Sequence, residues 1–233
     1  MTVSSTSKKE AICYYCDEPA TSDEHVPPKA LFPKPKDSPG GKEYRRNLLT
    51  VPSCDVHNTA KSKDDEYLLY VLALCWPSNE VGQNQFLTKV QRAAKRKPAL
   101  LNALTLEYQH ARIHDTEKDT REQSIAIRPD EKRLLDQFTH ISKAIYFLET
   151  GQHWPGSVSV LIEFLLSLDD VERNARLEGV VRVTEEYLVN VSHKGDNKEV
   201  FSYQFVENDG RAMLRLHFYG DNKVSAVFLQ CVS

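Results

Sequence analysis

The sequence has no run of 18 or more apolar residues, and its first residues, MTVSSTSKKEAIC, lack the apolar stretch that a signal peptide requires. We therefore expect a cytoplasmic protein that neither enters a membrane nor is exported. An excess of charge of one sign is also missing, since 30 basic and 33 acidic side chains leave a formal net charge of −3. Any contact with nucleic acid must therefore come from a local basic surface.

Cysteine is scarce and its number is odd. Five cysteines in 233 residues, without an export signal, argue against a disulfide framework and for reduced thiols. Cys13, Cys16 and Cys54 lie in the first quarter of the chain. Cys75 and Cys231 have apolar neighbours, and we expect both to be small buried hydrophobic residues.

Helical periodicity is absent from residues 1 to about 57, where VPPKALFPKPKDSPGG alone holds five prolines and two glycines. Short strands joined by loops fit this composition. Beyond it, the pattern predicts helices from Asn58 to about Trp76 and over 82–97, 98–113 and 130–150.

The last third of the chain changes to strand periodicity. Strands are predicted at about 199–206, 211–219 and 223–230, and the turn sequences NDG and GDN between them indicate an antiparallel meander. The apolar run SVSVLIEFLLSL at 157–168 fits a buried helix or a strand equally well.

Two pairs of metal-ligating residues stand at knuckle spacing. Cys13 and Cys16 enclose two residues, as do Cys54 and His57, and each pair can present two ligands from a tight turn to one tetrahedral zinc ion. A proline-rich module of about 60 residues cannot bury enough apolar surface alone, so a structural zinc would meet a physical need. The alternatives are a redox C-x-x-C motif, which the following loop disfavours, and a His57 that only caps the next helix.

A second group of residues points to hydrolysis. Glu24 and His25 are adjacent on a segment that prolines hold extended, so their side chains are expected on opposite faces, and Asn58 follows His57 directly. If this segment packs beside the helix start, the oxygens of Glu24 and Asn58 can share one hard divalent cation. The His25 imidazole can then take a proton from water.

These residues together resemble the HNH endonuclease family with its ββα-metal core. The resemblance covers about residues 10–75, and its motifs are Cys13-x-x-Cys16, Glu24-His25, Asn47-Leu48 and Cys54-x-x-His57-Asn58-x-x-Lys61. The chain departs from the commonest pattern in two places. Its second knuckle ends in histidine where cysteine is usual, and its last motif letter is asparagine, an H-N-N variant similar to that of phage junction-resolving endonucleases.

The resemblance implies a role for each residue. His25 would be the general base for the attacking water, and Glu24 and Asn58 would ligate Mg²⁺ or Mn²⁺. Asn47 would orient the loop that carries His25, and Lys61 would meet a phosphate. Structural roles stay open, with Asn47 as a turn residue and Lys61 as the partner of an acidic residue one turn later.

Two further features of the sequence bear on nucleic-acid binding. The segment KVQRAAKRK places Arg92, Lys95 and Arg96 on a predicted helix, where they are candidate phosphate contacts or a solvated helix end. Four aromatic residues of the predicted meander are candidates for a base-stacking platform, although alternating aromatics are more often the buried side of a strand. They are Tyr203, Phe205, Phe218 and Tyr219.

The sequence thus predicts an α+β protein with an N-terminal HNH nuclease module at 1–77 and a helical and β region at 78–233 for substrate or partner binding. The expected activity is metal-dependent cleavage of nucleic acid, with DNA as the first substrate to test. A partner such as an ATPase and a place in restriction or phage defence are compatible with it. The alternatives are a catalytically silent zinc module that binds nucleic acid or protein, and an RNA-cutting toxin.

Overall fold

The computed structural model describes residues 11–59, 62–96, 108–115 and 119–230, and it has an α+β fold, as the sequence predicts. The N-terminal part contains β1 (Ser22–His25), three 3₁₀ turns (Lys29–Leu31, Pro35–Asp37, Pro39–Gly41), β2 (Thr50–Ser53), α1 (Asp55–Thr59), α2 (Ser62–Leu74), α3 (Glu80–Gln85), a π-helical turn (Phe86–Val90) and α4 (Gln91–Arg96). The remainder contains β3 (Tyr108–Asp115), β4 (Thr120–Ile127), α6 (Glu131–Thr150), β5 (Ser157–Ile162), α7 (Val171–Leu188), β6 (Phe201–Asn208), β7 (Arg211–Phe218) and β8 (Asn222–Leu229).

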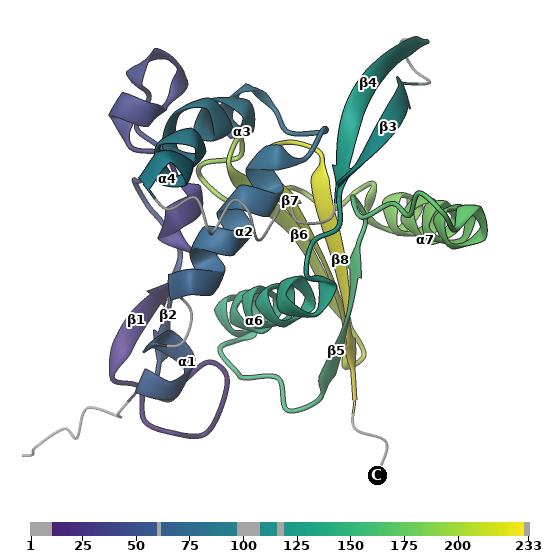
Figure 1. The fold of residues 1–233 in the computed structure, drawn as a ribbon. Coiled ribbons are helices and arrows are strands. Elements are labelled where there is room, and N and C mark those ends of the chain that lie inside the picture. Colours follow the sequence, from purple (N-terminus) through teal and green to yellow (C-terminus); the bar gives the residue numbers. More distant parts are fainter. Residues whose placement is uncertain (1–10, 60–61, 97–107, 116–118, 231–233) are drawn as a thin grey trace, which may run out of the picture.

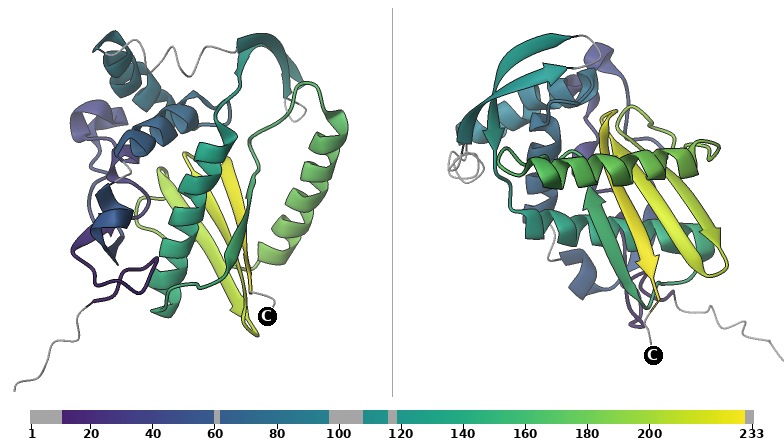
Figure 2. Two further views of the ribbon diagram at one scale, coloured as in Figure 1. Left: turned by 60° about the horizontal axis from the view of Figure 1, so that its bottom comes forward. Right: turned by 90° about the vertical axis from the view of Figure 1, so that its right-hand side faces the viewer.

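A four-stranded antiparallel sheet in the order β5-β8-β7-β6 forms the centre of the fold. The predicted meander is confirmed as β6, β7 and β8, and the ambiguous apolar run forms the edge strand β5 beside β8. Figure 2 shows α6 on one face of this sheet and α7 on the other. The α6 face holds the aromatic residues for which a stacking role was considered. Tyr203, Phe218 and Tyr219 are at most 5% exposed and Phe205 packs against them, so they are core residues.

Helix α6 matches its prediction closely because both of its ends carry strong signals. The carboxylate of Asp130 accepts a hydrogen bond from the Arg133 amide at 3.0 Å, and Gly151 ends the helix at a φ of 71°. Its apolar face packs Phe138 against Phe218 and Tyr146 against Phe205. Among the described residues, no helix combines the length and the apolar character needed to cross a membrane.

The predicted helix at 98–113 is wrong in its last part, and its residues 98–107 lie outside the described residues. Of the range 98–113, the described part belongs to β3, which pairs antiparallel with β4 from Tyr108↔Ile127 to Asp115↔Thr120. A strand of this kind depends on its cross-strand partner, which a helical reading of one short segment ignores. Helix α7 was not predicted. Its sequence shows little apolar periodicity, because the helix buries only Leu177, Thr184 and Leu188.

The N-terminal part packs on the same core as the sheet. β1 and β2 form a two-stranded antiparallel sheet in which Glu24 faces Val51 and His25 faces Thr50. The Tyr219 hydroxyl donates to the carbonyl of Leu31 at 2.6 Å, so a loop of the N-terminal part is tied to the end of β7. Buried residues from Cys13 to Phe228 form one cluster, and packing is continuous across the predicted boundary at residue 77.

The face of the sheet below α7 is polar. Arg215 on β7 forms a two-pronged ion pair with Glu163, and both side chains are at most 6% exposed. Beside it, the Nε2 of His217 lies 3.2 Å from Oε1 of Gln204 and therefore donates to that oxygen. Gln204 in turn donates to the carbonyls of Leu188 and Val191 at the end of α7. The polar layer thus holds α7 on the sheet.

This layer makes the protein sensitive to acid. Burial, reinforced by the nearby charges of His193, Arg215 and Lys223, lowers the pKa of His217 to about 3. Between pH 6.5 and 3 the unfolded chain therefore binds more protons than the folded one, and the free energy of unfolding falls as the pH falls. We expect His217 to lower the free energy of unfolding by about 2 kcal/mol between pH 7 and pH 5. The decrease is about 1.4 kcal/mol for each pH unit below 6.5.

Replacement by glutamine tests this expectation. Denaturant unfolding of wild type and His217→Gln at pH 7 and pH 5 should show a smaller loss of stability in the variant at the lower pH. An equal loss in both proteins would contradict it.

Candidate functional site

The predicted zinc ligands come together in the structure. The ligand atoms of Cys13, Cys16, Cys54 and His57 lie within 4.8 Å of one another. Nδ1 of His57 is 3.7, 3.6 and 3.2 Å from the three sulfurs in that order, and the sulfurs of Cys16 and Cys54 are 3.9 Å apart. A tetrahedral zinc with Zn–S of about 2.3 Å and Zn–N of about 2.0 Å separates its ligands by about 3.5–3.8 Å. The four side chains therefore fit a metal ion such as zinc.

Strand β2 brings the two pairs of ligands together. The amide of Tyr14, inside the first pair, donates to the carbonyl of Pro52 on β2 at 2.9 Å. Cys54 follows β2 directly, and its carbonyl accepts hydrogen bonds from the amides of His57 and Asn58 as α1 begins. The second pair is therefore presented by the first turn of a helix.

Helix α6 supports this metal centre from the side. The ring of Tyr15 contacts the rings of both His57 and His140, with centroid distances of 4.4 and 4.5 Å, and the two histidine rings are 6.2 Å apart. Nζ of Lys143, one helical turn after His140, lies 4.4 Å from the centroid of the Tyr15 ring. His57, one of the four residues that could hold a metal ion, is thus connected by aromatic contacts to the C-terminal part of the chain.

Glu24 and His25 border one small cavity, although adjacent residues of a strand point to opposite faces. The cavity has a volume of about 10 Å³, and residues of α6 line one side of it. It is lined by Tyr14, Glu24, His25, Val26, Pro28, Gln137, His140, Ile141 and Ala144. The Glu24 carboxylate accepts a hydrogen bond from Tyr14, and burial followed by this contact raises the pKa of the Tyr14 phenol above its usual value. Gln137 and His140 are site residues that no sequence spacing reveals, because they lie more than 100 residues away.

The electrostatic surroundings of His25 favour its neutral form. Burial and then the charge of Lys29 lower its pKa, and Arg45 acts in the same direction. The carbonyl of Leu49 faces the ring and raises the pKa by less. At pH 7 the imidazole is therefore uncharged and can accept a proton.

Lys29 and Arg45, which were not predicted as site residues, lie near Lys89, the first residue of the basic segment KVQRAAKRK. Nε of Arg45 donates to the carbonyl of Phe32 at 2.9 Å, and Nζ of Lys89 donates to that of Ala30 at 2.6 Å. Burial, followed by the charge of Arg45, lowers the pKa of Lys89 to about 8. Basic side chains from three different segments thus lie around the turn that follows His25.

Asn58 lies against β1. Its Nδ2 donates to Oγ of Ser22 at 2.6 Å. Ser22 and Glu24 are two residues apart on one face of the strand, a separation of about 7 Å. Carboxylate and carboxamide oxygens are the donors that a hard divalent cation takes, so the residue types suit such an ion. The described contact of Asn58 is with Ser22 rather than with Glu24.

Asn47 is a turn residue with a φ of 51°. Its amide donates to Asp196 at 2.8 Å, in the loop before β6. Two residues later, the carbonyl of Leu49 accepts from the amide of Val26 at 2.9 Å, so the backbone of this segment holds the chain that follows His25.

Among the remaining predicted phosphate contacts, Arg92 is paired with an acidic residue that also acts on the pKa of Lys89. Arg92 forms an ion pair of 2.7 Å with Asp37, whose side chain is 7% exposed. Lys95 and Arg96 are exposed at the end of α4, near the C-terminal end of α2, whereas α1 lies near its N-terminal end (Figure 1). Lys61 and Cys231 lie outside the described residues.

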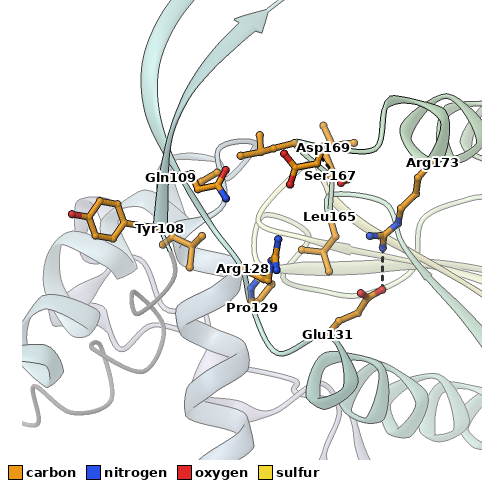
Figure 3. Close-up of a pocket in the computed structure, with 13 residues that line it drawn as sticks. Tyr108, Gln109, Arg128, Pro129, Glu131, Leu165, Ser167, Asp169 and Arg173 are labelled. Atoms are coloured by element: carbon orange, nitrogen blue, oxygen red, sulfur yellow. Dashed lines mark hydrogen bonds and ion pairs between the residues drawn. The ribbon is translucent and has the colours of Figure 1, made fainter.

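A much larger cavity, of about 590 Å³, lies elsewhere (Figure 3). It is bordered by the base of the β3–β4 hairpin, the start of α6 and the loop before α7, and Arg173 pairs with Glu131 at its edge at 3.1 Å. It holds none of the predicted site residues, and it carries charges of both signs in Arg128, Asp169 and this ion pair. Size alone therefore does not make it the reactive site.

No protein-family model, curated protein or solved structure matches this chain.

Proposed function

We propose that the protein is a metal-dependent endonuclease of the HNH type that hydrolyses phosphodiester bonds in nucleic acid, with DNA as its substrate. The position of Asn58 carries this proposal. Asn58 directly follows the zinc-type ligand His57 and contacts β1, the strand that ends in Glu24 and His25. One short helix therefore contributes both to the metal centre and to the group of residues that the motif associates with hydrolysis.

The side chains around β1 have complementary tasks in this proposal. His25 takes a proton from the attacking water, for which its neutral form at pH 7 is suited. Lys29 and Arg45 supply positive charge near His25 and attract a phosphate. Glu24 and Asn58 would hold Mg²⁺ or Mn²⁺, which when bound would stabilise negative charge on the phosphate and the departing oxygen.

A cleavage assay tests the proposal. Zinc-loaded full-length protein is incubated with supercoiled plasmid, single-stranded DNA and RNA, each with Mg²⁺, Mn²⁺ or EDTA. We expect plasmid nicking with Mg²⁺ or Mn²⁺, none with EDTA, and recovery when the divalent ion is added back. Absence of metal-dependent cleavage on all three substrates would refute it, and cleavage of RNA alone would instead support the toxin alternative.

A binding module is the second candidate, and the small volume of the Glu24–His25 cavity beside α6, about 10 Å³, favours it. In such a protein the cysteine and histidine centre would hold the fold, while Lys29, Arg45 and Lys89 would contact nucleic acid without turnover. Gel-shift binding of the same substrates distinguishes the two. Binding that weakens steeply with salt and is never followed by cleavage would support the module.

A further inference from the structure

Gln137 occupies an unusual position for an amide. It lies on the apolar face of α6 between Leu134 and Ile141, and its side chain is only 4% exposed. Its amide makes no hydrogen bond to another residue in the described part of the chain, and its oxygen and nitrogen keep some contact with the space beside α6. The Gln137 amide is therefore available to hydrogen-bond with a bound molecule that is not part of the protein.

The cavity beside Gln137 has the dimensions of a water site. Its volume of about 10 Å³ is the least that one water molecule needs, and such a water requires two to four polar partners. Gln137, Glu24 and His25 all line it. Nδ1 of His25 is buried, and no described residue forms a hydrogen bond with it, including Leu49, whose carbonyl faces the ring. The cavity thus offers both the space and the partners.

We propose that Gln137 is a positioning residue for His25 and acts through one bound water. Nδ1–H of His25 donates to the water oxygen, and the two water hydrogens go to Oε1 of Gln137 and to the carboxylate of Glu24. This arrangement keeps the proton on Nδ1 and leaves Nε2 as the basic nitrogen, because the partner of one ring nitrogen selects the tautomer of the imidazole. The inference deepens the proposed function, since the reactive group then depends on a helix far from the nuclease motif.

Replacement by methionine tests the role of the amide. Gln137→Met keeps the length of the side chain and removes both polar atoms, so the core stays filled. In ¹⁵N spectra of the zinc-loaded full-length protein at one fixed pH, the wild type should show His25 protonated on Nδ1. The variant should show a mixture of both tautomers. Its kcat for plasmid nicking should fall about 10- to 100-fold with KM unchanged, the usual loss when a group that orients a catalytic side chain is removed.

Ser142→Ala is the matched control. Ser142 is also on α6, fully buried and without a hydrogen-bond partner for its Oγ among the described residues, but it does not line the cavity. This variant should keep the wild-type His25 signals and kcat. If Gln137→Met does not fold, Gln137→Leu provides the same test in a smaller side chain.

The outcomes separate this inference from the proposed function. Unchanged His25 tautomer signals in a folded Gln137 variant would overturn the positioning role. A wild type that never cleaves would remove the nuclease, while the spectra would still decide whether Gln137 sets the tautomer.

Discussion

Cys54→Ser is expected to release the bound zinc and to unfold most of the protein. Cys54 is 6% exposed, and its sulfur lies within coordination spacing of Cys16 and His57. A structural zinc contributes about 10 kcal/mol or more of apparent binding free energy, which is as large as the whole stability of a typical domain. Buried hydrophobic residues around the N-terminal loops cannot replace this contribution, since prolines and short 3₁₀ turns occupy much of that segment.

Metal content and thermal unfolding provide the measurement. The wild type should contain one zinc per chain by elemental analysis, and Cys54→Ser should contain none and lose its cooperative unfolding transition. Cys75→Ser is the control, because Cys75 lies outside the four-residue centre and should keep the full zinc content. A wild type that is folded without zinc would exclude the structural role of the metal.

His25→Ala is expected to remove cleavage by a factor of about 10²–10⁴ while leaving zinc content and melting temperature near those of the wild type. The loss follows from removing the group that we propose accepts the proton of the attacking water. Stability should change little, because the partly exposed ring fills only the edge of a small cavity. Initial rates of plasmid nicking at saturating Mg²⁺, together with zinc analysis of the same preparations, give the comparison.

A second histidine controls for nonspecific effects. His110 on β3 is exposed and distant from β1 in Figure 1, so His110→Ala should nick plasmid at the wild-type rate. Wild-type cleavage by His25→Ala would show that another residue is the base. The same result would also show that the positioning of His25 by Gln137 and the bound water has no role in cleavage.

Features that depend on neighbouring residues were predictable. The two knuckle pairs could be recognised because ligands three positions apart reach one ion from a single turn, whatever the rest of the chain does. Helix α6 and the strands β6, β7 and β8 were likewise predictable, because caps, glycines and turn residues mark their ends. The zinc-type centre, α6 and the three strands of the meander follow from such local signals.

Features that depend on residues far away in the sequence were not predictable. The segment from Tyr108 to Asp115 is a strand because β4 pairs with it, and its own residues also permit the helix that was predicted. α7 stays on the sheet through Gln204 and Arg215, which are contributed by β6 and β7 rather than by its own apolar pattern.

The sequence specifies which side chains can ligate a metal or accept a proton. Cysteine, histidine, glutamate and asparagine keep this chemistry wherever they lie in the fold. Which of them meet is settled by packing. Gln137 and Arg45 reach the surroundings of His25 only because α6 and the loop before β2 are placed there by the shared core. Contacts across more than 100 residues arise from the burial of apolar surface by the whole fold, and no local spacing encodes them.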